Sequence, residues 1–266
     1  MRILLIALAV SLAAASAQAA PCTAESPDSA LTGKNECLVL RSFTGAQVAG
    51  APQALVVVLH GDVSGGGPAN YHFAWAQQLV DVPELARAVA IAVVRPGYED
   101  GAGARSGGSH NNRSDHYTAS NIDEVAGVVA KLKQLHQPQR VVLLGHSGGA
   151  AMAAVKAGRH PGLVDGVVLV ACPCHLADWR LSRNRSLWTL SESPHSWIDR
   201  IPLSTRIIAL TGTGDDNTGP RLAQDYVKRA RERGLNARFE AIDGASHNAA
   251  FRSPQVTAAV VELATR

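Results

Sequence analysis

The chain has 266 residues, of which 46% are hydrophobic, and a formal charge of +3 at neutral pH. These values indicate a folded protein, and the length suits one large α/β domain. They argue against a disordered chain and against a nucleic-acid surface, which needs a clustered basic face. The densest basic run, residues 228–233, fits the solvated face of a helix better than an anionic docking patch.

The N-terminal residues 1–19 have the pattern of a signal peptide. Arg2 supplies a short basic region, residues 3–15 are apolar, and Ala17-Gln18-Ala19 matches a small-x-small cleavage site. The apolar run is too short for a convincing membrane anchor. We therefore predict cleavage after Ala19, no membrane anchor after removal of the signal, and a periplasmic or secreted protein of bacterial type. Residues 20–266 then form a single domain.

Four cysteines fit an oxidising compartment: Cys22, Cys37, Cys172 and Cys174. Four cysteines allow three pairings, and the sequence does not choose among them. We favour Cys22–Cys37, which would pin the N-terminal segment to the first strand, and this leaves Cys172–Cys174. The alternative is a soft-metal site at residues 172–175, although such a site would need further ligands.

Strands and helices alternate along the chain. Residues 20–35, rich in Pro, Ser, Asp and Gly, are predicted as loop, and a first strand is expected over 36–43. Short apolar runs that indicate buried strands occupy 54–59, 88–94 and 141–144, and further strands are expected over 164–170, 207–210 and 237–242. Helical patterns occupy 71–80, 122–135, 149–160, 221–233 and 254–264.

This alternation predicts a mostly parallel central sheet with helices on both faces. Two stretches interrupt it. Residues 95–117 form a long polar loop, and loops of that length are often functional. Residues 172–200 are irregular, contain three tryptophans and are a candidate short cap over a site.

The segment Gly145-His146-Ser147-Gly148-Gly149 directly follows a predicted strand and opens a predicted helix. A tight strand-to-helix turn exposes a serine for attack and crowds the positions two before and two after it, where glycines stand here. This G-x-S-x-G pattern in this context is the signature of the α/β-hydrolase fold and makes Ser147 the candidate nucleophile.

That fold requires an acid and then a histidine after later strands. Asp215 and Asp216 follow the predicted strand 207–210, and His247 follows the strand 237–242. Both requirements are met in the expected order.

The mature chain resembles the α/β hydrolases, and its last third resembles prolyl-oligopeptidase-like and acyl-peptidase-like hydrolase domains. The similarity rests on Ser193-Pro194, Trp197-Ile198-Asp199 and the run from Gly212 to Asn217. It implies that the first aspartate of the pair, Asp215, is the acid, with Asp216 as the alternative, and that His247 is the histidine. The chain lacks a propeller, and Thr218 stands where those enzymes usually have valine. The resemblance thus supports the catalytic machinery more than peptidase specificity.

We therefore expect a serine hydrolase that acts on a small-molecule ester, with a short peptide as the alternative substrate. The backbone N–H groups of Asp62 and Gly148 are the candidate oxyanion donors. No HExxH, P-loop or dinucleotide fingerprint occurs, so we expect no metal and no cofactor.

Overall fold

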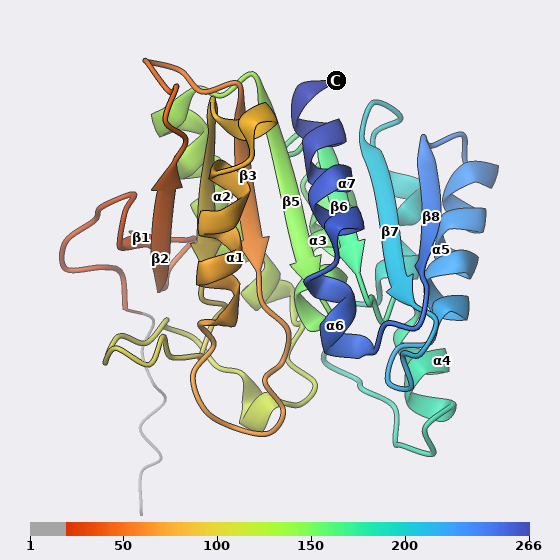
Figure 1. The fold of residues 1–266 in the computed structure, drawn as a ribbon. Coiled ribbons are helices and arrows are strands. Elements are labelled where there is room, and N and C mark those ends of the chain that lie inside the picture. The colour runs from red at the N-terminus through yellow and green to blue at the C-terminus, as the bar shows by residue number, and fades with distance from the viewer. Residues whose placement is uncertain (1–19) are drawn as a thin grey trace, which may run out of the picture.

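The computed structural model describes residues 20–266, so the predicted signal peptide lies outside the described residues. Its centre is an eight-stranded sheet in the order β1-β2-β4-β3-β5-β6-β7-β8 (Figure 1). β2 pairs antiparallel with β1 and with β4, and all other pairs are parallel. The strands are β1 (Ala30–Thr32), β2 (Cys37–Thr44), β3 (Ala54–Leu59), β4 (Ala88–Val93), β5 (Arg140–His146), β6 (Gly166–Val170), β7 (Arg206–Gly212) and β8 (Ala237–Ile242).

Helices cover both faces of this sheet, which confirms the predicted architecture. One face carries α1 (Tyr71–Val80), α6 (His247–Phe251) and α7 (Pro254–Thr265), seen in front in Figure 1. The other carries α2 (Ala119–His136), α3 (Gly148–Arg159) and α5 (Pro220–Glu232), and the short α4 (Leu176–Leu181) follows β6. None of the helices in residues 20–266 is long and apolar enough to cross a membrane.

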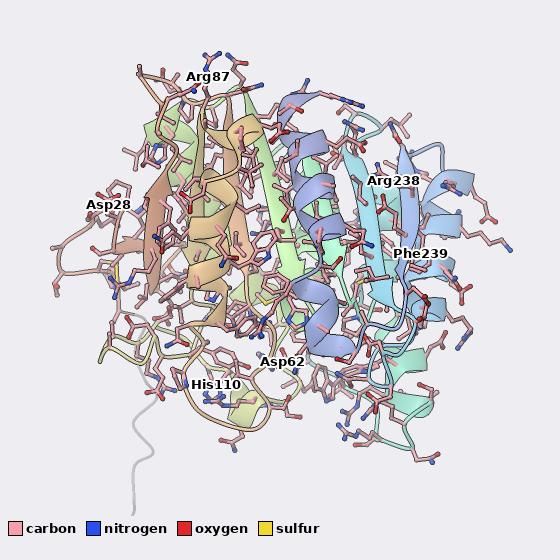
Figure 2. The ribbon with its side chains drawn as sticks, viewed as in Figure 1. Asp28, Asp62, Arg87, His110, Arg238 and Phe239 are labelled. Atoms are coloured by element: carbon pink, nitrogen blue, oxygen red, sulfur yellow. A yellow bond between two sulfur atoms is a disulfide. The ribbon has the colours of Figure 1, made fainter. Side chains whose placement is uncertain are left out.

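The central strands are buried on both sides because every residue of their apolar runs faces a helix layer. In β3, Leu55, Val57 and Leu59 belong to the core beneath α2 and α3, whereas the alternate residues belong to the core beneath α1 and α7. Successive side chains of a strand point to opposite faces, so a continuous apolar run fills two cores at once. Figure 2 shows side chains filling both layers.

Helix α2 shows how local sequence sets the ends of an element. The Thr118 hydroxyl accepts a hydrogen bond from the Asn121 N–H, so the helix begins a turn earlier than its apolar repeat. Gln137 takes a left-handed conformation at the other end, directly before Pro138. Leu135, the last residue of the predicted repeat, is exposed near this end.

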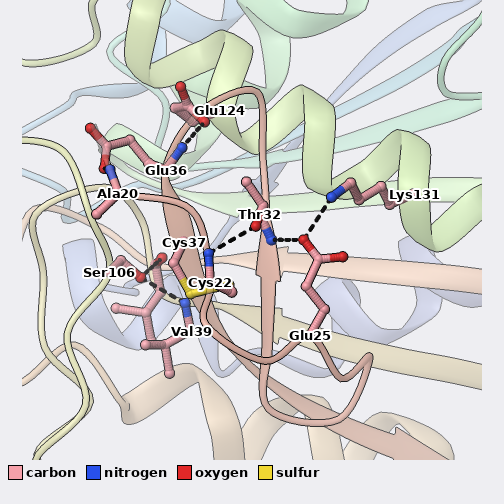
Figure 3. The surroundings of a disulfide bond; sticks show 11 residues. Ala20, Cys22, Glu25, Thr32, Glu36, Cys37, Val39, Ser106, Glu124 and Lys131 are labelled. Carbon is pink, nitrogen blue, oxygen red and sulfur yellow. Dashed lines mark hydrogen bonds and ion pairs between the residues drawn. A yellow bond between two sulfur atoms is a disulfide. The ribbon is translucent and has the colours of Figure 1, made fainter. Parts of the chain in front are cut away.

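The prediction of loop throughout residues 20–35 was wrong, because Ala30–Thr32 forms β1. A three-residue strand has no periodicity to detect, and it exists because it pairs with β2, with Ala30 opposite Val39. The adjoining turn is held by Glu124 of α2, a buried side chain whose carboxylate accepts the backbone N–H groups of residues 34–36 (Figure 3). A disulfide bond joins Cys22 to Cys37 beside it, as favoured above.

Four parallel strands end at the same edge of the sheet. β3 leads to Asp62, β5 to Ser147, β7 to Asp215 and β8 to His247. In Figure 2, Asp62 lies beyond the lower edge of the sheet, where these strands end. Ligand sites of open parallel sheets lie at this carboxyl edge.

Candidate active site

Ser147 occupies the tight turn between β5 and α3 with backbone angles φ 53° and ψ −118°. A left-handed φ is unfavourable for a residue with a side chain, and such strain of about 1–3 kcal/mol is held by the surrounding structure. The flanking glycines are required sterically. A Cβ on Gly145 would lie 2.4 Å from the Gly149 carbonyl oxygen, and one on Gly149 would lie 2.5 Å from the Leu59 carbonyl oxygen.

Ser147 and His247 line the same cavity, which has a volume of about 750 Å³. His247 opens the short helix α6, which the sequence analysis did not predict because five residues carry too little periodicity. Within the described residues, no hydrogen bond joins the Ser147 hydroxyl to the imidazole. The Nε2 atom of His247 instead lies 3.3 Å from the side-chain amide nitrogen of Asn217.

The other ring nitrogen of His247 lies 2.9 Å from Asp215 Oδ2. Asp215 is buried, whereas Asp216 is exposed. The Asp215 Oδ1 atom accepts the backbone N–H groups of Asn217 and Thr218 at 2.9 and 2.8 Å. Burial opposes the carboxylate charge, but the hydrogen bonds from His247 and Thr218 outweigh it and hold the pKa of Asp215 below its usual value.

Thr218 contacts both members of this pair. Its hydroxyl is fully buried and lies 2.9 Å from Asp215 Oδ2, 3.1 Å from His247 Nδ1 and 2.9 Å from the Ala171 carbonyl oxygen. A valine, the usual residue in the resembling enzymes, would make none of these hydrogen bonds. Thr218 in place of valine therefore adds a polar group behind His247.

The candidate oxyanion donors, Asp62 and Gly148, lie on either side of the turn. Neither backbone N–H donates a hydrogen bond to another of the described residues. The two segments are in close contact, since a Cβ on Gly148 would lie 2.0 Å from Asp62 Oδ1. Asp62 lines the cavity together with Ser147, whereas Gly148 is buried directly after Ser147.

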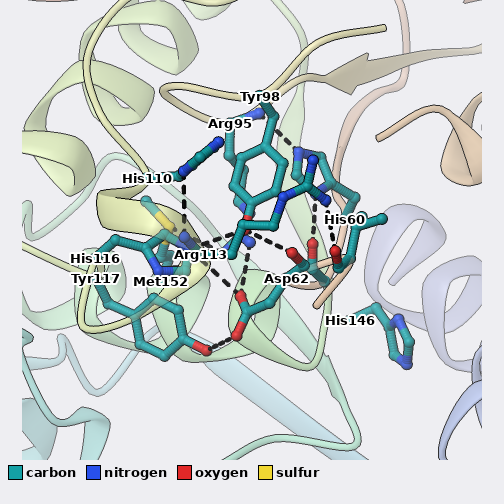
Figure 4. A network of polar contacts seen from close by, with 12 residues as sticks. His60, Asp62, Arg95, Tyr98, His110, Arg113, His116, Tyr117, His146 and Met152 are labelled. Carbon is teal, nitrogen blue, oxygen red and sulfur yellow. Dashed lines mark hydrogen bonds and ion pairs between the residues drawn. The ribbon is translucent and has the colours of Figure 1, made fainter. Parts of the chain in front are cut away.

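The Asp62 side chain belongs to a buried polar network (Figure 4). It forms an ion pair with Arg95 at 2.8 Å and accepts a hydrogen bond from the Tyr117 hydroxyl at 2.5 Å. The Tyr98 hydroxyl donates to the Asp62 carbonyl oxygen at 2.7 Å and lies 3.1 Å from His116 Nε2. Burial would raise the pKa of the Asp62 carboxyl, but the Arg95 charge overcomes it and the pKa is lowered.

Arg95, Tyr98 and Tyr117 were not predicted as partners of this loop. His116, from the long polar loop 95–117, belongs to the same network. The only signal was that Arg95 is the first charged residue after a buried strand. Pairing it with Asp62 requires knowing that β3 and β4 are neighbours.

His146, the residue directly before Ser147, connects three parts of the site. Its Nδ1 atom accepts a hydrogen bond from the Tyr71 hydroxyl at 2.7 Å, and that hydroxyl accepts the Gly61 N–H. Its Nε2 atom donates to the His247 carbonyl oxygen at 3.1 Å. Burial lowers the pKa of His146 to about 3, so the ring is neutral and this assignment of its protons is consistent.

The candidate cap divides into two parts. Trp179, Arg180, Arg185 and Trp188 line the cavity, whereas the 3₁₀ helix Pro194–Arg200 packs beside α3. Cys172 and Cys174 form a disulfide bond, which removes the thiolates that the alternative metal site needs. Within residues 20–266 no group of three or more His, Cys, Asp or Glu side chains could hold a metal ion.

Comparisons with known proteins agree with this architecture. The profile of the alpha/beta hydrolase family matches residues 56–197, more than half of the chain, and the protein therefore belongs to that family. Membership indicates a hydrolase. A search of curated proteins finds no match.

Solved structures share the fold at low sequence identity. Est1E from Butyrivibrio proteoclasticus, solved with ferulic acid, has a TM-score of 0.66 and 15% identity, with 88% of this chain and 96% of that chain covered. The Pyrococcus furiosus esterase Pf2001 has a TM-score of 0.65 and 16% identity over 88% and 89%. An acylaminoacyl peptidase has a TM-score of 0.65 and 13% identity over 88% of this chain and 40% of its own.

Proposed function

We propose that the protein is a serine hydrolase that cleaves carboxylic esters through a covalent acyl-enzyme. The observation that carries this proposal is the convergence of Ser147 and His247 on one cavity, with His247 Nδ1 bonded to the buried Asp215 carboxylate. A serine on a strained turn beside an imidazole that an acid orients is the arrangement that activates a hydroxyl for attack.

In this mechanism the Ser147 oxygen attacks the ester carbonyl while His247 takes the hydroxyl proton. His247 then protonates the leaving alcohol, and water hydrolyses the acyl-enzyme by the reverse proton transfers. Asp215 holds the imidazole with Nδ1 protonated and stabilises its charged form. The free structure lacks the Ser147–His247 hydrogen bond, and such bonds often tighten only when substrate binds.

The backbone N–H groups of Asp62 and Gly148 are proposed to stabilise the oxyanion. Their lack of partners among the described residues supports this role, as does the network that holds the Asp62 loop in place. Removing one such donor typically costs about 3 kcal/mol in the barrier.

An ester substrate is favoured over a peptide by the extent of the structural similarity. The alignments span nearly all of Est1E and of the esterase Pf2001 but less than half of the acylaminoacyl peptidase, so the chain matches the first two as whole molecules. Hydrolysis of short peptides is the second candidate, supported by the resemblance of residues 193–217 and by the shared peptidase fold.

We further propose that residues 20–266 act as one exported catalytic domain. The two disulfide bonds are compatible with an oxidising compartment, and the cleavage predicted after Ala19 would release this domain.

The nucleophile is tested with a fluorophosphonate probe and with 4-nitrophenyl acetate. We expect Ser147→Ala to abolish labelling and to lower the rate by about 10⁴-fold or more, with a similar loss in His247→Ala. Ser196→Ala, on the exposed part of the 3₁₀ helix, is the matched control. Continued labelling of Ser147→Ala would disprove the proposal.

Two further comparisons define the acid and the substrate class. Asp215→Asn should lower the rate much more than Asp216→Asn, and the opposite order would transfer the role to Asp216. A panel of ester, thioester, amide and aminoacyl-peptide substrates separates the esterase from the peptidase.

A further inference from the structure

The cavity beside Ser147 carries an excess of positive charge. Four arginines line it: Arg113, Arg180, Arg185 and Arg252. The one carboxylate in its lining, Asp62, is neutralised by Arg95. Within the described part of the chain, none of the four arginines has a carboxylate at salt-bridge distance, although arginines elsewhere in the molecule do.

Arg180 is the most enclosed of the four, with 9% of its surface exposed. Its Nε atom donates to the Ser186 carbonyl oxygen at 2.8 Å. Its two terminal NH₂ groups donate to no other described residue. An arginine cannot lose its charge under ordinary conditions, so these donors stay charged, and they have no acceptor among the described residues.

Two tryptophan rings lie close to this guanidinium. Its carbon lies 5.0 Å from the ring centre of Trp188 and 5.7 Å from that of Trp179, and both rings line the cavity. Burial and the nearby charge of Arg185 lower the pKa of Arg180, whereas Asp115 acts in the opposite direction. The Asp115 carboxylate is already bound by the backbone N–H groups of residues 189–191, so it does not supply the missing acceptor.

Arg113 adds positive charge at the facing loop. Its guanidinium donates to the carbonyl oxygens of Val63 and Gly67 and lies over the Tyr98 ring. Arg113 thus holds the glycine-rich loop around residues 63–67 beside the cavity. Its positive charge has no carboxylate partner among the described residues. Charge of one sign in a cleft raises the local concentration of ligands of the opposite sign.

We propose that the natural substrate is an ester that carries a carboxylate at the end remote from the scissile bond. The two terminal NH₂ groups of Arg180 bind this carboxylate as a fork, and the faces of Trp179 and Trp188 contact the intervening carbon chain. Arg113, Arg185 and Arg252 attract the anion to the cavity. This inference rests on the proposed ester hydrolysis at Ser147.

The test compares mono-4-nitrophenyl suberate with the primary amide formed at its free carboxyl group, which has the same length but no charge. The shorter adipate and longer sebacate pairs extend the comparison, and kcat/KM is measured for each ester. We expect at least about a tenfold preference for a carboxylate over its amide, the size that a charged hydrogen-bonded pair supplies. The preference should weaken as sodium chloride is added.

Arg180→Met should reduce the carboxylate-to-amide ratio to about one, and Arg180→Lys should retain part of it because the charge remains without the fork. Arg221→Met is the matched control, since Arg221 is exposed on α5 and, within residues 20–266, pairs with Asp225 alone. It should leave the ratio unchanged. The salt dependence of the unaltered protein gives an independent readout if Arg180→Met does not fold.

Equal rates on carboxylate and amide at every chain length would overturn the inference, as would an unchanged ratio in Arg180→Met. Probe labelling of Ser147 without hydrolysis of any of these esters also overturns it while leaving a serine nucleophile in place. If neither labelling nor hydrolysis occurs, the proposed function fails together with the inference.

Discussion

The Arg95 guanidinium and the Asp62 carboxylate form a 2.8 Å ion pair whose side chains are only 1% and 10% exposed. The pair joins Asp62, in the loop after β3, to Arg95, which lies just beyond the end of β4. Asp62 also contributes a candidate oxyanion donor, so the conformation of that donor depends on a charge from a neighbouring strand.

Removing one partner of this ion pair should destabilise the protein strongly. Arg95→Met leaves the Asp62 carboxylate buried without its counter-charge, and such losses typically cost about 3–5 kcal/mol. The free energy of unfolding in urea measures the change. In Arg221→Met, which breaks an exposed pair, we expect a change below about 1 kcal/mol. If the two variants lose similar amounts of unfolding free energy, the buried pair contributes no more to stability than the exposed pair.

Thr218→Val should lower kcat while leaving KM nearly unchanged. The hydroxyl lies behind the Asp215–His247 pair, outside the cavity lining, so it positions the imidazole and does not contact substrate. Asp215 keeps its two backbone donors in the variant, so we expect a loss of about tenfold, the effect of one hydrogen bond to a charged group. Thr218→Ser retains the hydroxyl and should recover most of the activity. A fall confined to KM would contradict this role.

Lys156→Met should stabilise the protein at neutral pH. Lys156 of α3 is fully buried, its Nζ atom has no partner among the described residues, and burial lowers its pKa from 10.5 to about 7. Between these two values the unfolded chain binds a proton that the folded protein does not, so stability rises with pH. Below about pH 7 the folded protein carries the buried charge and the full penalty applies. Each pKa unit corresponds to about 1.4 kcal/mol, so we expect a gain of several kcal/mol at pH 7.

Urea unfolding of Lys156→Met at a series of pH values from 7 to about 10 measures this effect. The increase in unfolding free energy relative to the unaltered protein should become smaller as the pH rises. Lys228→Met, at an exposed position of α5, is the control and should follow the pH dependence of the parent. A gain in Lys156→Met that is the same at every pH would exclude titration of this lysine as its cause.

Local patterns predicted most of the elements of this protein. The apolar run 54–59 matched β3 at both ends, because a strand buried on two faces leaves a pattern that needs no partner to recognise. The predicted strand 237–242 also matched β8, although this edge strand is only partly buried. The short elements β1 and α6 were missed. Each is formed by contacts with distant segments, so its own residues carry little periodicity.

The candidate site divides in the same way. Ser147, Asp215 and His247 could be chosen as candidates because the turn at Ser147 imposes glycines at fixed spacing and the fold imposes the order of the other two. The partners of Asp62 and the hydrogen bonds of His146 were beyond reach, since Arg95, Tyr117 and Tyr71 come from separate crossovers.

The sequence by itself determined the strand-helix alternation, the strained turn and the residues that follow each strand, because these depend on interactions within a few residues. Only the tertiary structure decided which loops meet at the carboxyl edge and where the unpaired arginines lie. Those features depend on strand order and on contacts between segments remote in the chain, which local physical chemistry does not specify.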